Sequence, residues 1–492
     1  ETSWPSLCYS VIFNPQRVLA VAESRPRRGV AERMCIGERV GPRAWQSPPR
    51  TFSSGFSAVA LSSLFLLLLP LAAPHSHSGR RREWKCVHDS IVHNTPLISN
   101  QKYPISHGGA VLQGGGGLGT RLLEGAKEWI GGKGFRRQDQ GGSRDAFQPI
   151  RVAIYSDLEG KLSEDKKAYV LSLVSSASSF FQRSLKVVPI LGNLFVERDC
   201  VEKWISGPRE GLCSTAVAPT CGTVSSVPAS HLREITLWNT QNNGNDWVKT
   251  VLPGGDGVPN ADLLIYVTTG DGVGGNGTID GQGGCSDPTT MAFSGTCQRD
   301  QYDRPVVGYV HFCAERIQPT TDASLRWEDD ALAAHEITHV LGFSTLSFAL
   351  FRKPDNTPYL PRCPGADGCT AQDRDGYPPG AYQGISFAPE VVKTSTLRGN
   401  SISTLVTPSV RDIAARHYGC PDILGAELEE HGGPSTAGSH WEKRVLNTEY
   451  MVGSTDGVFP SVYSAFTLAL LQDSGWYIVS WDSAGEMVWG RG

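Results

Sequence analysis

Residues 335–339, with the sequence His-Glu-Ile-Thr-His, constrain this chain more than any other stretch. The residues before them are rich in Ala and Leu, and no Gly or Pro interrupts the run before Gly342, so the motif is expected near the end of a helix. Residues four apart share a helix face, which would place His335 and His339 side by side with Glu336 next to them. This arrangement is typical of a catalytic zinc site that needs one further protein ligand and leaves a position for water.

Paired histidines also occur on ordinary packed or exposed helix faces, so the rest of the chain has to decide between these interpretations. With 492 residues and 39% hydrophobic side chains, the chain is long enough for a large buried core and more than one domain. A net charge of −4 offers no basic surface for nucleic acid. The 12 cysteines indicate an oxidising compartment with disulfides, and 55 Gly and 31 Pro predict many loops.

The N-terminal region is predicted to be a leader followed by a secretory signal. The first methionine is Met34, so residues 1–33 are expected to lie outside the natural product. Residues 34–75 combine basic residues with an apolar, Leu-rich run at 58–69 and small residues for cleavage. An uncleaved membrane anchor is the alternative, although the run is short for crossing a bilayer. The mature protein is therefore expected in the secretory pathway, outside the cell or at its surface.

Residues 76–147 are predicted to form a pro-segment. They are largely polar and contain a Gly-rich tract at 108–117, a composition that buries too little apolar surface for a tight fold. Arg136 and Arg137 within this segment are either a processing site or an ordinary solvated pair of basic residues.

From residue 148 onwards the patterns predict an α+β fold. Apolar runs favour strands, and an amphipathic run preceded by Ser163 favours a helix. The predicted strands cover 150–155, 186–191, 262–269 and 305–312, and the predicted helix covers 163–185. The third strand is mostly apolar and is expected at the centre of a mixed sheet backed by two helices. Asn276, in a Gly-rich loop, begins a glycosylation sequon.

The region after the motif helix is expected to be irregular. Residues 352–387 are rich in Pro, Gly and Asp, and Cys363 and Cys369 within them predict an inserted loop tied by a disulfide. Helical patterns return at 410–418 and at 463–472, the second of them buried.

Spacing alone does not identify the third ligand. The compact arrangement would put a histidine six residues after His339, where this chain has Thr345. A carboxylate on a second helix is the other common choice, but the only glutamate between Gly342 and Arg398 is Glu390, which stands beside a proline. Three histidines remain farther along the chain, namely His417, His431 and His440.

Several separate motifs make the chain similar to leishmanolysin and the invadolysin-like metallopeptidases, a branch of the metzincins. The resemblance covers roughly residues 84–492, and its segments include 335–344, 425–429, 438–442, 450–451 and 472–477. It implies a metzincin-like catalytic domain with a twisted mixed sheet and a zinc-binding helix, followed by an inserted loop-rich region. The corresponding division is an N-terminal catalytic subdomain at 148–343 and, at 344–492, a subdomain with the insertion and the third ligand.

The resemblance also implies the roles of the site residues. His335, His339 and His440 would hold one Zn²⁺ per chain, and Glu336 would act as the general base towards water. Met451 would lie in the turn beneath the metal, where a methionine provides a polarizable apolar floor.

Two further expectations follow from the resemblance. Peptide or protein substrates would bind in an extended form, adding a strand beside residues 308–312. Cys86 belongs to a Cys-x-His-Asp pattern like those of the family's pro-segments, and its thiolate would occupy the water position until the pro-segment is removed. The alternative for Cys86 is an ordinary disulfide.

Cysteine counting bears on the C-terminal end of the chain. Three cysteines precede the mature part and nine remain, which cannot all pair with one another. Cys420 is the candidate for the unpaired one. The family continues into a Cys-rich C-terminal domain, so the chain is expected to be truncated before it, and any membrane attachment would lie beyond Gly492.

The sequence therefore predicts a secreted or cell-surface zinc endopeptidase that is made as a zymogen and acts on peptides or proteins. The alternative is a catalytically silent adhesion or binding protein that keeps the metallopeptidase fold. The intact Glu336 favours the enzyme, because a purely structural metal site has no need of a base.

Overall fold

The computed structural model describes residues 84–85 and 146–492, apart from 242–245, 271–283, 364, 371–375, 381–385, 398, 432–435 and 456–459. All of these residues belong to one compact unit, Arg81–Gly492. The predicted signal, Cys86, the pair Arg136 and Arg137, and Asn276 lie outside the described residues.

Helices and strands are interspersed along the chain. The helices are α3 (Glu164–Ser184), α4 (Ala323–Leu341), α5 (Thr345–Phe348), α6 (Pro408–His417), α7 (Lys443–Leu446) and α8 (Ala465–Asp473). Short 3-10 turns cover Ala229–His231, Gly284–Ser286 and Trp481–Ser483. The helices predicted at 163–185, 410–418 and 463–472 are therefore confirmed as α3, α6 and α8.

The strands fall into a longer and a shorter group. The longer strands are β3 (Val152–Asp157), β5 (Asp199–Lys203), β6 (Cys213–Val217), β7 (Ile235–Gln241), β8 (Asp246–Leu252), β9 (Leu263–Thr269), β10 (Ala292–Arg299), β11 (Pro305–Phe312), β12 (Val392–Leu397) and β13 (Asn400–Leu405). The strands of two or three residues are β1 (Trp84–Lys85), β2 (Gln148–Pro149), β4 (Leu185–Val187), β14 (Ala426–Glu427), β15 (Ser454–Thr455) and β16 (Ile478–Val479).

A four-stranded sheet in the order β10-β11-β9-β3 supports the motif helix. β9 pairs in parallel with both β3 and β11, whereas β10 pairs antiparallel with β11, so the sheet is mixed. Every residue of β9 and β11 is buried, as expected for strands covered on both faces. The apolar strand predicted at 262–269 is confirmed in the interior of the sheet. β10 escaped prediction because polar residues interrupt its apolar pattern, although all of its residues are buried.

The strand order corrects the expectation about substrate binding. A strand can accept a further strand only along a free edge. β11, which contains residues 308–312, has β10 on one side and β9 on the other, so it has no free edge. The prediction of a substrate strand beside residues 308–312 is therefore wrong. Among the described strands of this sheet, the free edges belong to β10 and β3.

A second difference concerns the strand predicted at 186–191, of which only β4 forms. β4 lies between β16 and β2 in a small antiparallel sheet. Pro189 has no N–H to donate, and proline is excluded from the interior of a paired strand, so the pairing ends before it.

Helix α4 packs closely on the sheet, against β10 and β11, with α3 alongside it. The two elements approach closely at Gly308, where a Cβ atom would lie 2.4 Å from Val340 Cγ1 and 2.8 Å from the carbonyl oxygen of Gly295. Only glycine allows this approach. Asp322 caps the start of α4 by accepting hydrogen bonds from the N–H groups of Ser324 and Leu325.

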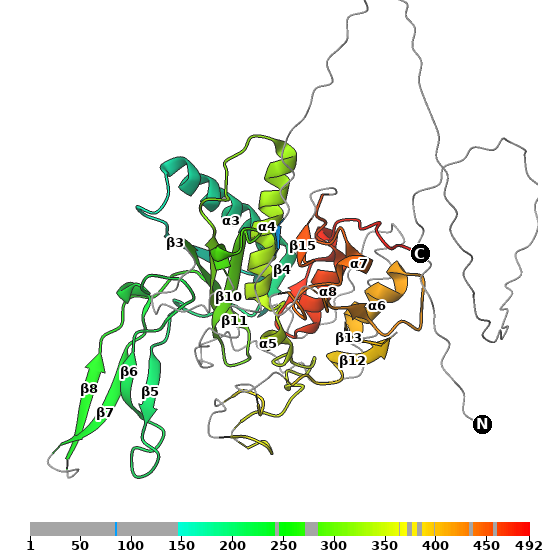
Figure 1. Cartoon of the computed structure of the whole chain (residues 1–492). Helices are drawn as coiled ribbons and strands as arrows, with labels where there is room; N and C mark the ends of the chain where they lie inside the picture. Colours follow the sequence, from blue (N-terminus) through cyan, green and yellow to red (C-terminus); the bar gives the residue numbers. More distant parts are fainter. Residues whose placement is uncertain are drawn as a thin grey trace, which may run out of the picture. The chain divides into compact units, whose positions relative to one another are not determined.

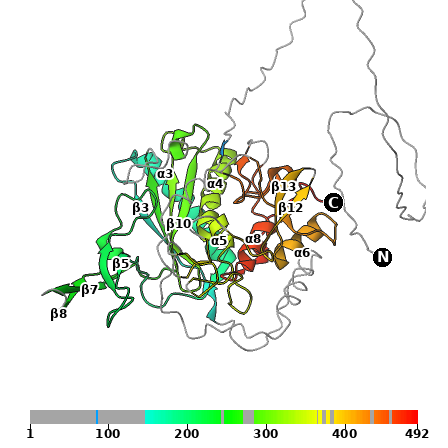
Figure 2. The same ribbon diagram turned by 60° about the horizontal axis from the view of Figure 1, so that its bottom comes forward.

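The C-terminal elements lie on the other side of α4 from the sheet (Figures 1 and 2). The end of the helix is held there by Tyr477, whose hydroxyl donates to the carbonyl of Leu341 at 2.9 Å. α4 ends at Gly342, whose φ of 137° is a conformation that side chains rarely allow. A single hydrophobic cluster extends from Ile150 to Met487 and therefore includes residues from both predicted subdomains.

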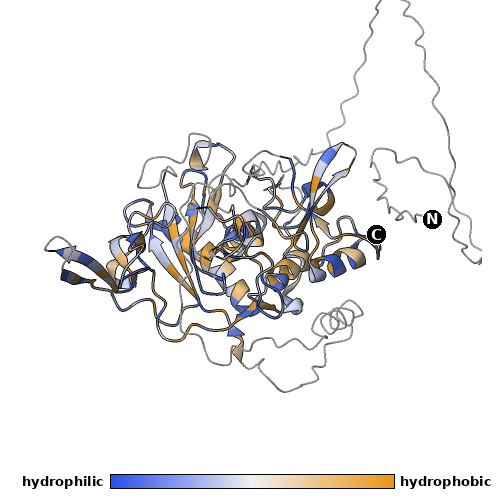
Figure 3. Ribbon diagram, turned by 90° about the horizontal axis from the view of Figure 1, so that it is seen from below, coloured by the Kyte–Doolittle hydropathy of each residue, from blue (hydrophilic) through white to orange (hydrophobic). Residues whose placement is uncertain are grey.

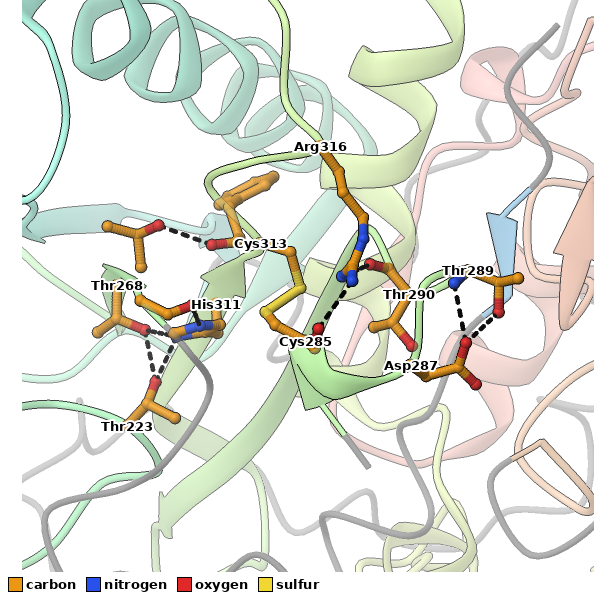
Figure 4. Close-up of a disulfide and its surroundings, with 12 residues drawn as sticks. Thr223, Thr268, Cys285, Asp287, Thr289, Thr290, His311, Cys313 and Arg316 are labelled. Carbon is orange, nitrogen blue, oxygen red and sulfur yellow. Dashed lines mark hydrogen bonds between the residues drawn. A yellow bond between two sulfur atoms is a disulfide. The ribbon is translucent and has the colours of Figure 1, made fainter. Parts of the chain in front are cut away.

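Four disulfides cross-link the described residues. They are Cys200–Cys213, Cys221–Cys297, Cys285–Cys313 and Cys363–Cys369, and Cys420 is free. The predicted bond between Cys363 and Cys369 and the unpaired Cys420 are both confirmed. Figure 4 shows Cys285–Cys313, beside which Arg316 donates to the carbonyl oxygens of Cys285 and Thr290 at 2.7 Å each. This group ties the segment before β10 to the end of β11.

Two hairpins, β5–β6 and β7–β8, project from the sheet (Figure 1). Apolar residues gather in the body of the molecule, and hydrophilic residues are prominent along the projecting hairpins (Figure 3). Trp204 and Trp247 pack edge to face with ring centroids 4.7 Å apart, and the guanidinium of Arg209 lies 3.8 Å from the ring centroid of Trp238. In the part of the chain that the structure describes, no helix has the length and apolar character needed to cross a membrane.

Candidate functional site

The motif residues lie in the last two turns of α4, in the interior of the protein. His335, Glu336 and His339 are all fully buried. The two imidazoles face each other with their Nε2 atoms 3.0 Å apart, as the spacing of four residues predicts. The helix therefore presents two histidines from one face.

His440 completes this group from a distant part of the chain. Its ring lies 5.2 Å from that of His335 and 4.9 Å from that of His339, measured between centroids. One ligand atom from each of the three histidines lies within 4.8 Å of the other two, and His440 is also fully buried. Residues 105 positions apart thus converge at one point (440 − 335).

The Nδ1 atom of each of these rings donates a hydrogen bond to a backbone carbonyl. Because a carbonyl oxygen can only accept, Nδ1 carries the hydrogen and Nε2 of the neutral ring carries a lone pair. For His335, His339 and His440 in turn, the acceptors are the carbonyl oxygens of Tyr450 at 2.7 Å, Phe343 at 2.7 Å and Thr436 at 2.8 Å. Backbone hydrogen bonds of this kind orient the imidazole ligands of metal ions.

The donor atoms fit a metal cation. Among the described residues, Nε2 of His440 is buried with no hydrogen-bond partner, a costly situation for a polar atom unless something binds there. Burial also lowers the pKa of His440 to about 4, against the hydrogen bond to Thr436, so its ring is neutral at physiological pH. Three imidazole nitrogens match the ligand set of a zinc site with an open position.

Glu336 is held by the sheet rather than by the helix alone. The hydroxyl of Ser294, in β10, donates both to Oε2 and to the backbone carbonyl of Glu336, at 2.8 Å each. The edge strand and the motif helix therefore share a direct polar contact at the carboxylate. A buried carboxylate oriented in this way beside a metal-bound water would be suited to accept a proton.

Met451 lies in a buried turn that a carboxylate braces. Glu449 is almost fully buried and accepts hydrogen bonds from the N–H of Met451 and from the hydroxyls of Ser464 and Thr467. The latter two residues lie at the start of α8 and within it. Trp441, next to His440, donates its backbone N–H to the carbonyl of Met451 at 3.0 Å. The turn thus joins α8 to the segment that carries the third histidine.

The other candidates for the third ligand lie elsewhere. His417 contacts the carbonyl oxygen of Trp489 at 2.8 Å through Nε2, His431 has a largely exposed side chain, and Glu390 lines a separate surface cavity with Lys393. Thr345 is part of α5. None of these residues belongs to the histidine group that the structure describes.

Sequence reasoning missed the supporting residues. Ser294 lies in the strand that was not predicted, and the three carbonyl acceptors belong to the backbone, which has no residue-specific signal. Glu449 offered a weak signal, because an acidic residue in a segment between apolar residues has to be paired when it is buried. Cys86 lies outside the described residues.

The sequence is similar to that of known proteins over much of its length. A family model described as leishmanolysin matches residues 254–492, a range that contains the three histidines and Met451. Over 368 residues, the chain is 30% identical to the leishmanolysin-like peptidase of Caenorhabditis elegans, covering 70% of this chain and 51% of that protein.

Two further relatives match a similar share of this chain. The leishmanolysin-like peptidase of Drosophila pseudoobscura pseudoobscura is 31% identical over 70% of this chain and 50% of its own length. The ciliated left-right organizer metallopeptidase of Mus musculus is 29% identical over 70% of this chain and 46% of its own length. The chain spans about half the length of these curated relatives.

The histidine geometry predicts the effect of removing one ligand. His440→Ala would leave two imidazoles, and we expect metal affinity to fall by more than roughly tenfold, since even loss of a residue that only supports a ligand costs ten- to a hundredfold. His417→Ala is the matched control and should retain full metal content. Metal per chain, measured by plasma mass spectrometry after dialysis against buffered zinc, tests both. Equal metal content in the two variants would refute the assignment of His440.

Glu449 predicts a pH dependence of stability. Burial raises the pKa of Glu449 from 4.5 to about 7, opposed by its hydrogen bonds to Thr467, Met451 and Ser464. Between these pH values the folded protein keeps a proton that the unfolded chain releases, so the free energy of unfolding falls as pH rises through this range, by on the order of 3 kcal/mol. Glu449→Gln, which cannot ionise, should lack this decrease in urea denaturation. Parallel pH profiles for the variant and the parent would contradict the prediction.

Proposed function

Because the chain belongs to the leishmanolysin family of metallopeptidases, we propose that it is a zinc-dependent endopeptidase, made as a zymogen and secreted or held at the cell surface. One observation carries the proposal, namely the convergence of three buried imidazoles beside a helix turn that also presents Glu336. The four disulfides support an oxidising compartment.

The metal ion and the side chains would have different roles in the reaction. A zinc ion held by His335, His339 and His440 would polarise the scissile carbonyl and lower the pKa of a bound water. Glu336 would accept a proton from that water and later deliver it to the leaving amine. Ser294 would keep the carboxylate of Glu336 in place through both steps, since it already donates to Oε2.

We place the substrate along the free edge of β10. An extended peptide binds by adding a strand to an exposed edge. On its outer side β10 pairs with no described strand, although its residues are buried. It carries Ser294, whose hydroxyl contacts Glu336, so a peptide paired with β10 would pass close to the base. β3, the other strand with a free edge, lies at the far side of the sheet from β10.

A contact of the predicted pro-segment supports the zymogen. β1 pairs antiparallel with β15, with Lys85 opposite Ser454. Ser454 follows Met451 by three residues (454 − 451), and Lys85 immediately precedes Cys86. The pairing therefore brings the chain to the neighbourhood of the Met451 turn just before the cysteine.

The proposal is tested by measuring casein hydrolysis with and without a chelator, after proteolytic removal of residues up to 147. We expect hydrolysis that the chelator abolishes and added Zn²⁺ restores. A correctly folded, zinc-loaded chain without hydrolysis would instead favour the adhesion protein that retains the fold.

Glu336→Ala separates chemistry from metal binding. General acid–base catalysis contributes ~10²–10⁴-fold, so we expect turnover to fall by at least this factor while zinc content stays at the parent level. Glu390→Ala, at an exposed glutamate away from the histidines, is the control and should leave turnover unchanged. Near-normal turnover by zinc-loaded Glu336→Ala would remove Glu336 from the mechanism.

Cys86→Ser tests the source of latency. A hydroxyl is a much poorer zinc ligand than a thiolate, so the unprocessed Cys86→Ser chain should hydrolyse peptides before any cleavage of the pro-segment. Cys420→Ser removes the free cysteine that lies outside the histidine group and should stay latent. If Cys86→Ser is as latent as the parent, the thiol has no part in latency.

A further inference from the structure

A second group of potential metal ligands lies beside the histidine centre. It consists of Glu429, His431 and Glu442, each with one ligand atom within 4.8 Å of the other two. Two of these residues precede His440 in the chain and one follows it. The group has no role in the proposed hydrolysis.

Glu442 is the residue that points to a bound cation. It is only 5% exposed, and its Oε1 atom accepts a hydrogen bond from the N–H of Arg444 at 3.0 Å, which caps α7. Its Oε2 atom is buried, and no described residue donates to it. The Oε2 atom of Glu430 is in the same situation. A buried carboxylate oxygen without a donor is costly and calls for a partner.

The neighbouring charges do not supply that partner. Arg444 forms an ion pair with Glu427 and approaches Glu442 only at Oε1, at 3.8 Å. The ammonium group of Lys443 instead reaches the hydroxyl of Ser454 at 3.4 Å. The carboxylate of Glu429 accepts hydrogen bonds from the backbone N–H groups of His431 at 2.8 Å and Lys443 at 3.5 Å, which are uncharged donors. No described residue therefore gives Oε2 of Glu442 the positive partner that a bound cation would supply.

We propose that Glu429, His431 and Glu442 bind a second divalent metal ion of the zinc type. Two carboxylates and an imidazole are the mixed oxygen and nitrogen ligands that suit transition metals, whereas Ca²⁺ takes oxygen ligands alone. The side chain of His431 is 71% exposed, so the ion can enter from solvent and leave again. This places the second ion in exchange with free metal, unlike an ion enclosed by the three buried histidines.

An ion at this position would clamp the segments on both sides of His440. Glu429 already donates its backbone N–H to the carbonyl of His440 at 2.8 Å, and Glu442 donates its own to the carbonyl of Glu427 at 3.0 Å. The ion adds a side-chain link between the same two segments. Its binding therefore stiffens the part of the chain that supplies the third histidine.

The test is the number of zinc ions bound per full-length chain as a function of buffered free Zn²⁺. The parent should bind a first equivalent at low free Zn²⁺ and a second at higher levels. His431→Ala and Glu442→Gln should lose only the second. Because His431 is exposed, its replacement leaves the fold intact, and Gln at position 442 keeps the acceptor for Arg444. His417→Ala is the control and should bind both equivalents.

Two results would overturn the proposal: a parent chain that never exceeds one equivalent, and a second equivalent that survives in both variants. Metal content is read independently of hydrolysis, so an inactive chain can still confirm the second site. His339→Ala separates the two centres, because it should lose the first equivalent and keep the second.

Discussion

Three hydrogen bonds from histidine Nδ1 atoms to backbone carbonyls determine whether this protein can hold a metal ion. Each carbonyl belongs to a different segment, at the end of the motif helix, in the Met451 turn and in the loop before His440. The bonds fix the hydrogen on Nδ1 and turn the Nε2 lone pairs towards one another, an arrangement that is unfavourable unless a cation lies between them. The metal site is therefore a property of the folded backbone as much as of the three side chains. Any change that moves one of these segments should lower the affinity of the site for a metal ion.

The rest of the structure holds those three segments in fixed positions relative to one another. Gly308 lets α4 lie directly on β11, and Gly342 allows the chain to leave the helix so that Phe343 can offer its carbonyl to His339. On the opposite side, Glu449 joins the Met451 turn to α8 at the expense of a buried carboxyl group. Both faces of α4 are thus anchored, one by close packing and the other by polar contacts. This combination suits a site that has to present several groups with little freedom of movement.

Much of the fold and of the candidate site could be predicted from the sequence. The features that could not be predicted share a physical cause, since they depend on contacts between distant parts of the chain. The motif helix and the buried strand β9 follow from composition and periodicity, which are local properties. Counting predicts one unpaired cysteine among nine, but the choice of Cys420 relied on the family resemblance. His440 was singled out from His417 and His431 only through the family resemblance, because nothing in the residues themselves reports a contact across more than a hundred positions. The position of β11 inside the sheet and the existence of β10 depend on strand order, which no single segment encodes. The three carbonyl acceptors are the hardest feature to predict, because every residue has a backbone carbonyl and the sequence does not distinguish among them.

The short pairing of β1 with β15 depends on the continuity of the chain between them. While the chain is intact, residues 84–85 are tethered to the strand they pair with, and the tether keeps them at a high effective concentration. Two residues form few ladder hydrogen bonds, so the pairing is weak in itself. Once the connecting segment is cut, the same strand becomes an ordinary peptide whose occupancy follows its bulk concentration. On dilution the freed strand would then leave β15 without any chemical step.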